Sequence, residues 1–404
     1  MNHPFSLVPG HRILSEGGRA VARHGRYTLA SAFQPVVSPA LMRAVGVEAL
    51  LRVSDERGEH CTQAFLERLD TLDLVDTCRV ARALHVLNAP TLPNGNEWLF
   101  LNLAPESIRL RKLDAQTVAQ ELSALDLPPA RIVFEIVERA GLDDGELRAF
   151  VEEYRAAGFR IAIDDFGAGA SNYDRVLGIQ PDIIKLDRSL IANASASTRA
   201  RRLFPHIVAL LREAGSLVLV EGIETEEQAQ IAIDADAELL QGYFFARPEP
   251  APAVDTFRKR LSLLMGTGTA PVRGRTDVGR FRSRFLDTWT AFRDGRPIEL
   301  IAQDIAEPEI TRLYVIDAKG YQVGDTALTR GATRGHTHPL SNAQGACWAR
   351  RHYFQRAMEQ PGRIQVTRPY LSLTEQRLCV TWSCATSHPA HGQCVVCMDV
   401  LVDG

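Results

Sequence analysis

Acidic, amide and lysine side chains recur where short apolar runs end, up to about Pro250. In chain order they are Glu48, Asn102, Glu135, Asp164, Asp165, Lys185, Asp187, Glu221 and Gln241. Carboxylates that gather at one place repel one another unless cations lie between them, and oxygen ligands of this kind suit Mg²⁺ or Mn²⁺. Two such ions can hold the attacking and leaving oxygens of a phosphoryl transfer. The residue types therefore predict a two-metal hydrolytic site, provided that the fold brings them together.

The neighbouring pair Asp164-Asp165 suits such a site, because one carboxylate can bridge two ions while the other holds the second ion. Lys185 can orient a nucleophilic water without binding metal. Taken alone, each residue has a simpler interpretation. A carboxylate at a strand end is more often a helix cap or a salt-bridge partner, and a lone lysine is usually solvated. Only their coincidence favours the catalytic interpretation.

The apolar runs have the length and composition of strands buried on both faces. They are Ala32–Val37, Val45–Leu51, Trp98–Leu103, Ile132–Val137, Arg160–Ile163, Ile183–Leu186, Leu217–Val220 and Leu239–Phe245. Helical spacing of apolar residues separates many of them, at Ala64–Leu87, Asp143–Ala157, Ser197–Ala214 and Thr225–Ala235. Eight strands that alternate with helices predict a TIM-like (β/α)8 barrel, in which distant strand ends meet at the C-terminal mouth.

Eight ordered motifs in this region resemble those of the EAL domain, a bacterial family of cyclic di-GMP phosphodiesterases. They are Phe33-Gln34-Pro35-Val36-Val37, Glu48-Ala49-Leu50-Leu51-Arg52, Asn102-Leu103, Glu135-Ile136-Val137-Glu138, Asp164-Asp165-Phe166-Gly167, Lys185-Leu186-Asp187, Glu221-Gly222-Ile223-Glu224-Thr225 and Gln241-Gly242-Tyr243. The resemblance extends from about Tyr27 to Pro250. It implies hydrolysis of cyclic di-GMP to linear pGpG, with two Mg²⁺ or Mn²⁺ ions per active site.

The resemblance also implies a role for each matching residue. Metal ligands would be Glu48, Asn102, Glu135, Asp164 and Asp165, with Glu221 supporting the second metal site. Lys185 would hold the nucleophilic water and Asp187 would orient Lys185. Gln34, Arg52 and Gln241 would contact the dinucleotide, Arg52 through a phosphate oxygen.

Glu138 would steady the loop Asp165–Tyr173, which in this family also touches a dimer interface, so a homodimer through the barrel is expected. Val53 and Ala170 stand where the family often has aromatic residues. These departures concern the substrate rim and the loop, and they leave the implied metal ligands unchanged.

The whole chain has 404 residues, enough for two domains, and a net charge of −3, which argues against binding a nucleic acid polymer. No apolar run approaches the roughly 20 residues that span a bilayer, and no secretory leader is evident. We therefore expect a cytoplasmic protein with reduced cysteines. The expected division is a barrel domain over 1–265, a Gly- and Pro-containing linker over 266–280 and a second domain over 281–404.

The second domain is expected to be α+β. A helix is predicted at Phe281–Phe292, and strands at Arg312–Ile316, Tyr321–Val323, Ile364–Val366, Leu378–Ser383 and Gln393–Val402. Short motifs such as Leu313-Tyr314-Val315-Ile316-Asp317 resemble a PAS-like or Cache-like sensor, which would regulate the barrel in response to an unknown small-molecule or protein signal. Cys394 and Cys397 lie three apart in a strand-like run, so they should face opposite sides and not share a metal ion.

Three functions remain open from sequence alone. The metal-ligand pattern favours an active hydrolase. A catalytically silent cyclic di-GMP receptor, or an interaction protein without ligand binding, would be expected to lack some of these carboxylates or the lysine.

Overall fold

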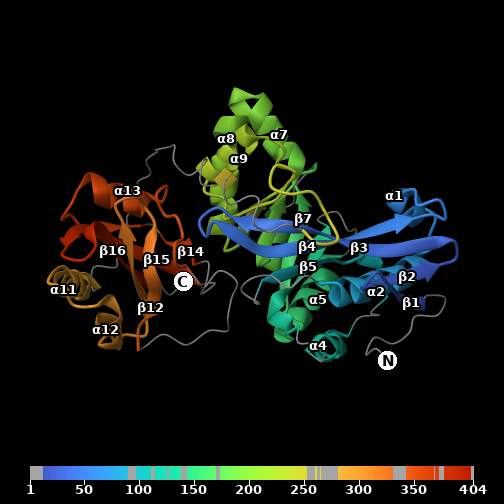
Figure 1. Cartoon of the computed structure of the whole chain (residues 1–404), viewed down its shortest axis with the longest axis horizontal. Coiled ribbons are helices and arrows are strands. Elements are labelled where there is room, and N and C mark those ends of the chain that lie inside the picture. Colours follow the sequence, from blue (N-terminus) through green and yellow to red (C-terminus); the bar gives the residue numbers. More distant parts are fainter. Residues whose placement is uncertain are drawn as a thin grey trace.

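The protein is described from a computed structural model, which covers residues 12–89, 97–110, 114–123, 125, 127–137, 143–169, 173–252, 260, 261, 264, 281–330, 343–367, 369–372 and 377–401. Figure 1 shows a barrel with outer helices and a second, smaller sheet domain beside it. The predicted linker 266–280 lies outside the described residues.

Eight strands form the closed barrel. They are β3 (Tyr27–Ser38), β4 (Arg43–Ser54), β5 (Trp98–Asn102), β6 (Ile132–Val137), β7 (Arg160–Phe166), β8 (Ile183–Leu186), β9 (Leu217–Val220) and β10 (Leu239–Leu240). Strands β4 to β10 are parallel neighbours, and β3 closes the ring by pairing with both β4 and β10. Each of the eight predicted runs therefore overlaps a barrel strand, although β10 holds only the first two residues of Leu239–Phe245, and the barrel prediction is confirmed.

The first barrel strand departs from the predicted alternation. Strand β3 runs antiparallel to β4 and β10, and no helix separates β3 from β4. The short turn at 39–42 explains this, because a parallel crossover needs a dozen or more residues whereas antiparallel strands can be joined by a tight turn. Met42 in this turn has a positive φ of 55°.

Helices cover the outside of the barrel (Figure 1). Their bounds are α1 (Thr62–Leu66), α2 (Thr71–Leu87), α3 (Pro105–Arg109), α4 (Ala115–Ser123), α5 (Asp144–Ala156), α6 (Tyr173–Ile179), α7 (Arg188–Ala196), α8 (Thr198–Glu213) and α9 (Glu226–Asp234). Helix α9 opens with a capping box in which Thr225 and Gln228 satisfy each other's backbone N–H groups. The four predicted helical stretches are confirmed, the first as α1 and α2.

Two further strands precede the barrel and were not predicted. Strand β1 (Arg12–Glu16) pairs with β2 (Arg19–His24), and β2 pairs with the outer part of β3. Their polar faces hide the strand pattern, since only Val21 and Ala22 of β2 are buried.

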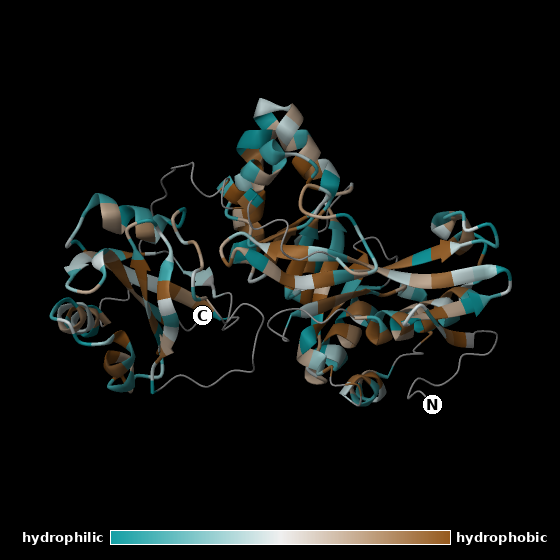
Figure 2. Ribbon diagram, in the orientation of Figure 1, coloured by the Kyte–Doolittle hydropathy of each residue, from teal (hydrophilic) through white to brown (hydrophobic). Residues whose placement is uncertain are grey.

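Apolar side chains fill the barrel, as the burial of nearly every residue of β5, β6, β8 and β9 requires. Figure 2 shows these strands largely in brown, whereas the outer helices mix brown and teal. Burial on both faces is the reason that the runs read as continuous apolar segments and not as alternating ones.

The second domain is an antiparallel sheet with helices on both faces, so the predicted α+β class is confirmed. Its strands are β11 (Ile310–Asp317), β12 (Gln322–Leu328), β13 (Gln365–Val366), β14 (Tyr370–Leu371), β15 (Leu378–His388) and β16 (Gly392–Leu401). They lie in the order β12-β11-β16-β15-β13, with β14 also on β15. Its helices are α11 (Arg282–Arg293), α12 (Ile298–Gln303) and α13 (His352–Glu359).

Cys394 packs with α11 and α12, and Cys397 packs with α13 on the other face. The prediction that these two thiols face opposite sides is therefore confirmed. The PAS-like or Cache-like identity of the domain stays a prediction. Within the described ranges, no helix is both long enough and apolar enough to cross a membrane.

Candidate active site

The polar residues singled out in the sequence converge at the C-terminal mouth of the barrel. Glu48 lies in β4, Glu135 in β6 and Lys185 in β8, and the last residues of β5 and β7 add Asn102 and the aspartate pair. Glu221 and Gln241 directly follow β9 and β10. Because every parallel strand starts at the same end of the barrel, side chains from far apart in the sequence meet here.

The Lys185 ammonium lies at the centre of four carboxylates. Its Nζ is 2.5 Å from Glu135, 2.7 Å from Glu221, 3.1 Å from Asp164 and 3.6 Å from Glu48. Lys185 is only 1% exposed, so water contributes little to the stability of its charge. The surrounding carboxylates outweigh burial, which alone would lower its pKa, and the Lys185 pKa is raised well above its usual value. The lysine is therefore held as a cation.

One ammonium cannot neutralise four carboxylates. Burial, together with the neighbouring acidic groups, raises the pKa of Glu135 well above its usual range and that of Glu221 to about 8. Burial opposes ionisation of Glu48 as well, but Lys185 and the Gln241 amide lower its pKa overall. A divalent cation would stabilise the ionised carboxylates and release the protons that they hold.

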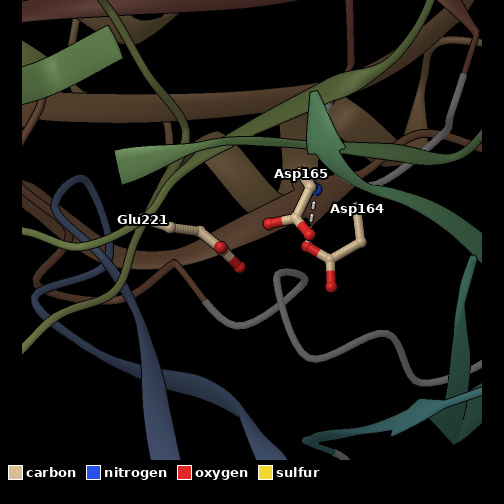
Figure 3. A group of neighbouring side chains, drawn as sticks. All are labelled: Asp164, Asp165 and Glu221. Atoms are coloured by element: carbon tan, nitrogen blue, oxygen red, sulfur yellow. Dashed lines mark hydrogen bonds between the residues drawn. The ribbon is translucent and has the colours of Figure 1, made fainter. Parts of the chain in front are cut away.

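Three carboxylates form a group suited to a metal ion. Ligand oxygens of Asp164, Asp165 and Glu221 all lie within 4.8 Å of one another. Figure 3 shows the three side chains facing a common space between β7 and the loop after β9. Asp165 has a φ of 57°, uncommon for a non-glycine residue, and its N–H donates to Asp164 Oδ1 at 2.9 Å.

The donor set fits hard divalent cations. It offers oxygens alone, it carries excess negative charge, and Glu135 Oε2 is buried without a hydrogen bond, whereas Lys185 Nζ lies 2.5 Å from Oε1. Such orphaned acceptors are costly unless a cation or proton meets them.

A hydrogen-bonded chain of amides fixes Glu48. Gln241 Nε2 donates to Glu48 Oε2 at 2.7 Å and to Gln34 Oε1 at 3.4 Å. Asn102 Nδ2 donates to Glu48 Oε1 at 3.3 Å. Gln34 lies directly opposite Glu48 in the β3–β4 register. The sequence suggested substrate contacts for Gln34 and Gln241, but it did not indicate that they also hold a predicted metal ligand.

Two residues implied by the family resemblance lie near the cluster with other contacts. Arg52 is half-buried in β4, and its Nη1 donates to Leu51 O at 3.0 Å. Asp187 caps α7 by accepting from Ser189 N at 2.9 Å, and its charge helps to raise the pKa of Asp165, after burial and Asp164. It is not among the four carboxylates within 4 Å of Lys185 Nζ, so its proposed orienting role stays a prediction. Glu138 and Ala170 lie outside the described residues.

One buried histidine near Arg52 was not predicted from the sequence. His85 Nδ1 lies 2.8 Å from Ser31 Oγ, and burial, with a smaller effect of the Arg52 charge, lowers its pKa to about 3. Its position within the amphipathic helix α2 gave no signal, because an imidazole on an apolar helix face has no local sequence mark.

Glycines shape the loops that carry Glu221 and Gln241. Gly222 has a φ of 64°, and a Cβ there would lie 2.2 Å from the Arg188 Cβ. A Cβ on Gly242 would lie 2.1 Å from the Ile223 carbonyl oxygen. Only glycine, which lacks a Cβ, fits at these two positions, so steric crowding explains why both motifs contain glycine there.

Comparison of the sequence with models of known protein families gives a match. The family model described as "EAL domain" matches residues 19–248. The chain is 34% identical over 154 residues to the cyclic di-GMP phosphodiesterase RocR of Pseudomonas aeruginosa, a match that covers 38% of this chain and 39% of RocR. The chain spans less than half the length of curated relatives such as this one.

Solved structures agree on the fold. BlrP1 of Klebsiella pneumoniae, in a complex with manganese and cyclic di-GMP, is 25% identical, with a TM-score of 0.52 and 61% of each chain covered. The Bacillus subtilis YkuI protein, which has an EAL domain, is 18% identical with a TM-score of 0.52, and the match covers 93% of this chain and 97% of YkuI. The YkuI likeness shows the fold alone, but it includes both domains. With a matched family model over more than half of its residues, this chain belongs to the EAL domain family.

Proposed function

We propose that the barrel hydrolyses one phosphodiester bond of cyclic di-GMP to give linear pGpG. The observation that carries this proposal is the gathering of four buried or partly buried carboxylates around a single buried ammonium at the barrel mouth, with the Asp164, Asp165 and Glu221 group beside it. RocR is named a cyclic di-GMP phosphodiesterase, and the BlrP1 structure is a complex with cyclic di-GMP, which supports this choice of substrate.

The metal ligands in this proposal are Glu48, Asn102, Glu135, Asp164 and Asp165, with Glu221 beside the second ion. Two divalent cations, Mg²⁺ or Mn²⁺, would supply positive charge to the attacking and leaving oxygens of the displacement. Asp164 belongs both to the four carboxylates around Lys185, with 3.1 Å to its Nζ, and to the group of Asp164, Asp165 and Glu221. Asp164 would therefore be available to both cations.

Lys185 orients the attacking water and remains charged throughout, since carboxylates surround its Nζ. Water adds to phosphorus, the bond to the 3′ oxygen breaks, and that oxygen takes the proton released from the water. Gln34 and Gln241 face the same space as Glu48 and contact the dinucleotide, while Arg52 binds a phosphate oxygen. A guanidinium suits a phosphate because its N–H groups match two oxygens at once.

The test is incubation of the purified protein with cyclic di-GMP and Mg²⁺ or Mn²⁺, followed by chromatography of the products. We expect pGpG to accumulate with either metal and to disappear when a chelator is added. Binding of cyclic di-GMP without any product would contradict hydrolysis and would instead establish the silent receptor. Absence of both binding and product would favour an interaction protein.

The second domain, in this proposal, regulates turnover. Its signal and the direction of its effect are left to experiment, and so is the expected homodimer. Sedimentation of the purified protein over a range of concentrations measures the dimer directly.

A further inference from the structure

One connection in the second domain closes the barrel at the end opposite the mouth. This docking segment, Ala343–Arg351, precedes α13. Its own domain holds it through β12, where Gln322 N donates to Ala346 O at 2.8 Å and Trp348 N donates to Gly320 O at 2.7 Å. The indole of Trp348 also donates to Gln322 Oε1 at 3.0 Å. The segment is therefore a fixed part of the second domain.

The other side of the docking segment lies against the barrel. Cys347 N donates to Ala40 O, in the β3–β4 turn, at 2.6 Å. Ala346 is 1% exposed and packs in one cluster with Leu41 and with residues from the first halves of the barrel strands, among them Trp98, Ile183, Leu217 and Leu239. These strand ends form the bottom of the barrel, so the docking segment seals the face that is remote from the metal-ligand residues.

Charged residues surround this apolar contact. Arg350 pairs with Asp234 at the end of α9, and Arg351 Nη1 lies 3.5 Å from Asp236 Oδ1. Asp236 has a φ of 63°. Such a conformation persists only where the surroundings hold it, and the arginines of the second domain are among those surroundings.

These acidic residues lead directly into the candidate active site. Asp236 is followed by Glu238, by the two-residue strand β10 and then by Gln241. Strand β10 matches β3 at one residue pair, Leu240 with Val37, and it pairs with β9 at two. A strand this short has few ladder bonds of its own, so contacts at its two ends contribute much of what fixes it. Upstream of β10, Asp236 lies near Arg351 of the second domain and Arg212 of the barrel, and Glu238 pairs with Arg212 and accepts from Val218 N. Downstream, Gln241 donates to Glu48.

We infer that Arg350 and Arg351 are positioning residues for the candidate active site. By fixing the start of β10, they set where the Gln241 amide meets the Glu48 carboxylate. For its enzymatic consequence this inference rests on the proposed function, because Glu48 is a metal ligand in that proposal. Its structural consequence, the ordering of β10 by the second domain, is independent of any activity.

The test is a double variant, Arg350→Gln with Arg351→Gln, in the full-length chain. Hydrogen–deuterium exchange of the peptide that covers 237–246 should rise severalfold, because β10 loses the part of its upstream anchor that the second domain supplies, while the Arg212 contacts remain. The affinity for Mn²⁺, measured by calorimetry without nucleotide, should fall about fivefold. In turnover assays, kcat/KM for cyclic di-GMP should fall while the circular dichroism spectrum is unchanged.

Two further variants make the result specific. Arg296→Gln removes a pair with Asp304 inside the second domain and should leave exchange at 237–246 and Mn²⁺ affinity as in the unaltered protein. Arg351→Asp alone should also raise exchange at 237–246. Combining it with Asp236→Arg exchanges the two charges and should restore part of the protection from hydrogen–deuterium exchange. Should the double Gln variant fail to fold, Asp234→Asn with Asp236→Asn removes the same two pairs from the barrel side and replaces it in the experiment.

The outcomes separate the two proposals. Unchanged exchange at 237–246 in a folded variant whose docking segment has become exchangeable would overturn the positioning role, whatever the activity. An unaltered protein that makes no pGpG would refute hydrolysis, while the exchange measurement would still decide whether the arginines order β10.

Discussion

At the scale of single residues, the candidate site depends on charge balance. Glu48 is held by two amides and lies within 3.6 Å of Lys185, so its geometry is fixed before any cation arrives. Glu48→Gln removes one anionic ligand and keeps the side-chain volume. We expect kcat to fall on the order of 100-fold or more, because electrostatic groups at a reacting centre have effects of this size.

The measurement for Glu48→Gln is product formation with Mg²⁺ or Mn²⁺, together with the melting temperature of the metal-free protein. The control Glu226→Gln alters an exposed acidic residue of the first turn of α9 and should leave kcat unchanged. A folded Glu48→Gln protein with kcat near that of the unaltered chain would show that Glu48 is not a metal ligand.

Lys185 supports a second prediction, on stability. Lys185→Met leaves four carboxylates without their ammonium, and breaking a buried ion pair by removing one partner costs about 3 to 5 kcal/mol. The loss should be largest in the metal-free protein and should shrink with Mn²⁺, since bound cations replace the missing positive charge. Urea unfolding with a chelator and with Mn²⁺ tests this, and equal losses in both conditions would contradict it.

His85 supports a pH prediction. Its pKa is about 3 in the folded chain, against about 6.5 in an unfolded one, so the unfolded state binds the extra proton between these values. The contribution of neutral His85 to the free energy of unfolding is therefore fully present above about pH 6.5. It is lost as the pH falls towards 3, and the loss is about 2 kcal/mol at pH 5.

His85→Gln should reduce the pH dependence of the free energy of unfolding by the equivalent of about one bound proton. Urea midpoints of both proteins between pH 5 and pH 7.5 provide the comparison. Parallel curves for the two proteins would show that His85 is protonated in the folded state or already neutral when unfolded.

At the scale of elements, the turns before and after β9 need glycine for two different reasons. Gly222 combines a positive φ with a close neighbour, the Arg188 Cβ at 2.2 Å from a built Cβ, whereas Gly215 has a positive φ of 94° with nothing within 4 Å. Gly215→Ala should cost about 1 kcal/mol from strain alone, and Gly222→Ala at least about 2 kcal/mol more from the clash.

Chemical denaturation of the Gly215→Ala and Gly222→Ala proteins gives both values on one scale. Gly222→Ala should also lower kcat/KM, because the substituted residue follows Glu221. Similar losses of stability at the two positions would mean that Arg188 moves aside, and that only backbone strain matters.

The elements also show why sequence was informative for the barrel. Strands buried on both faces, such as β6 and β9, appear as continuous apolar runs, and Glu135 within β6 and Glu221 after β9 lie at the mouth. Strands β1 and β2 lack that signal, since most of their side chains are polar and only partly buried. The direction of β3 could not be read from its composition, because it depends on the length of the turn that follows.

Part of the candidate site could be predicted because its residues end strands, and the rest could not because it depends on tertiary contacts. The mutual arrangement of Gln34, Gln241 and Glu48 requires β3 and β10 to be neighbours, although about 200 residues separate them in the chain. His85 and the docking segment have no local pattern at all. Both become visible only once distant segments are packed.

At the scale of the molecule, the second domain contributes a piece of the barrel's surface. A chain shortened to 1–265 would lose the docking segment and expose Leu41, Met42 and the strand starts that Ala346 and Cys347 cover. We expect a lower melting temperature and a greater tendency to aggregate, since newly exposed apolar patches favour association. Calorimetry and light scattering on the shortened and full-length chains measure both effects.

A shortened chain that melts at the same temperature and stays monodisperse would show that the contact contributes little stability. The sequence-based expectation that the second domain regulates turnover is a separate matter, tested by comparing kcat of the two chains with saturating metal.

The antiparallel strand β3 has a consequence for synthesis of the chain. One edge of β3 pairs with β4, which follows at once, but the other, which β2 covers only at 27–29, waits for β10 and for the backbone exchange between Phe33 and Glu249. At about 5 to 20 residues per second, a ribosome takes roughly 10 to 40 s to make the intervening segment. During that time the nascent chain presents an unpaired, apolar strand edge, which is a template for pairing with other chains. Yield in a host cell should therefore depend on chaperones that bind the first half of the chain before the second half exists.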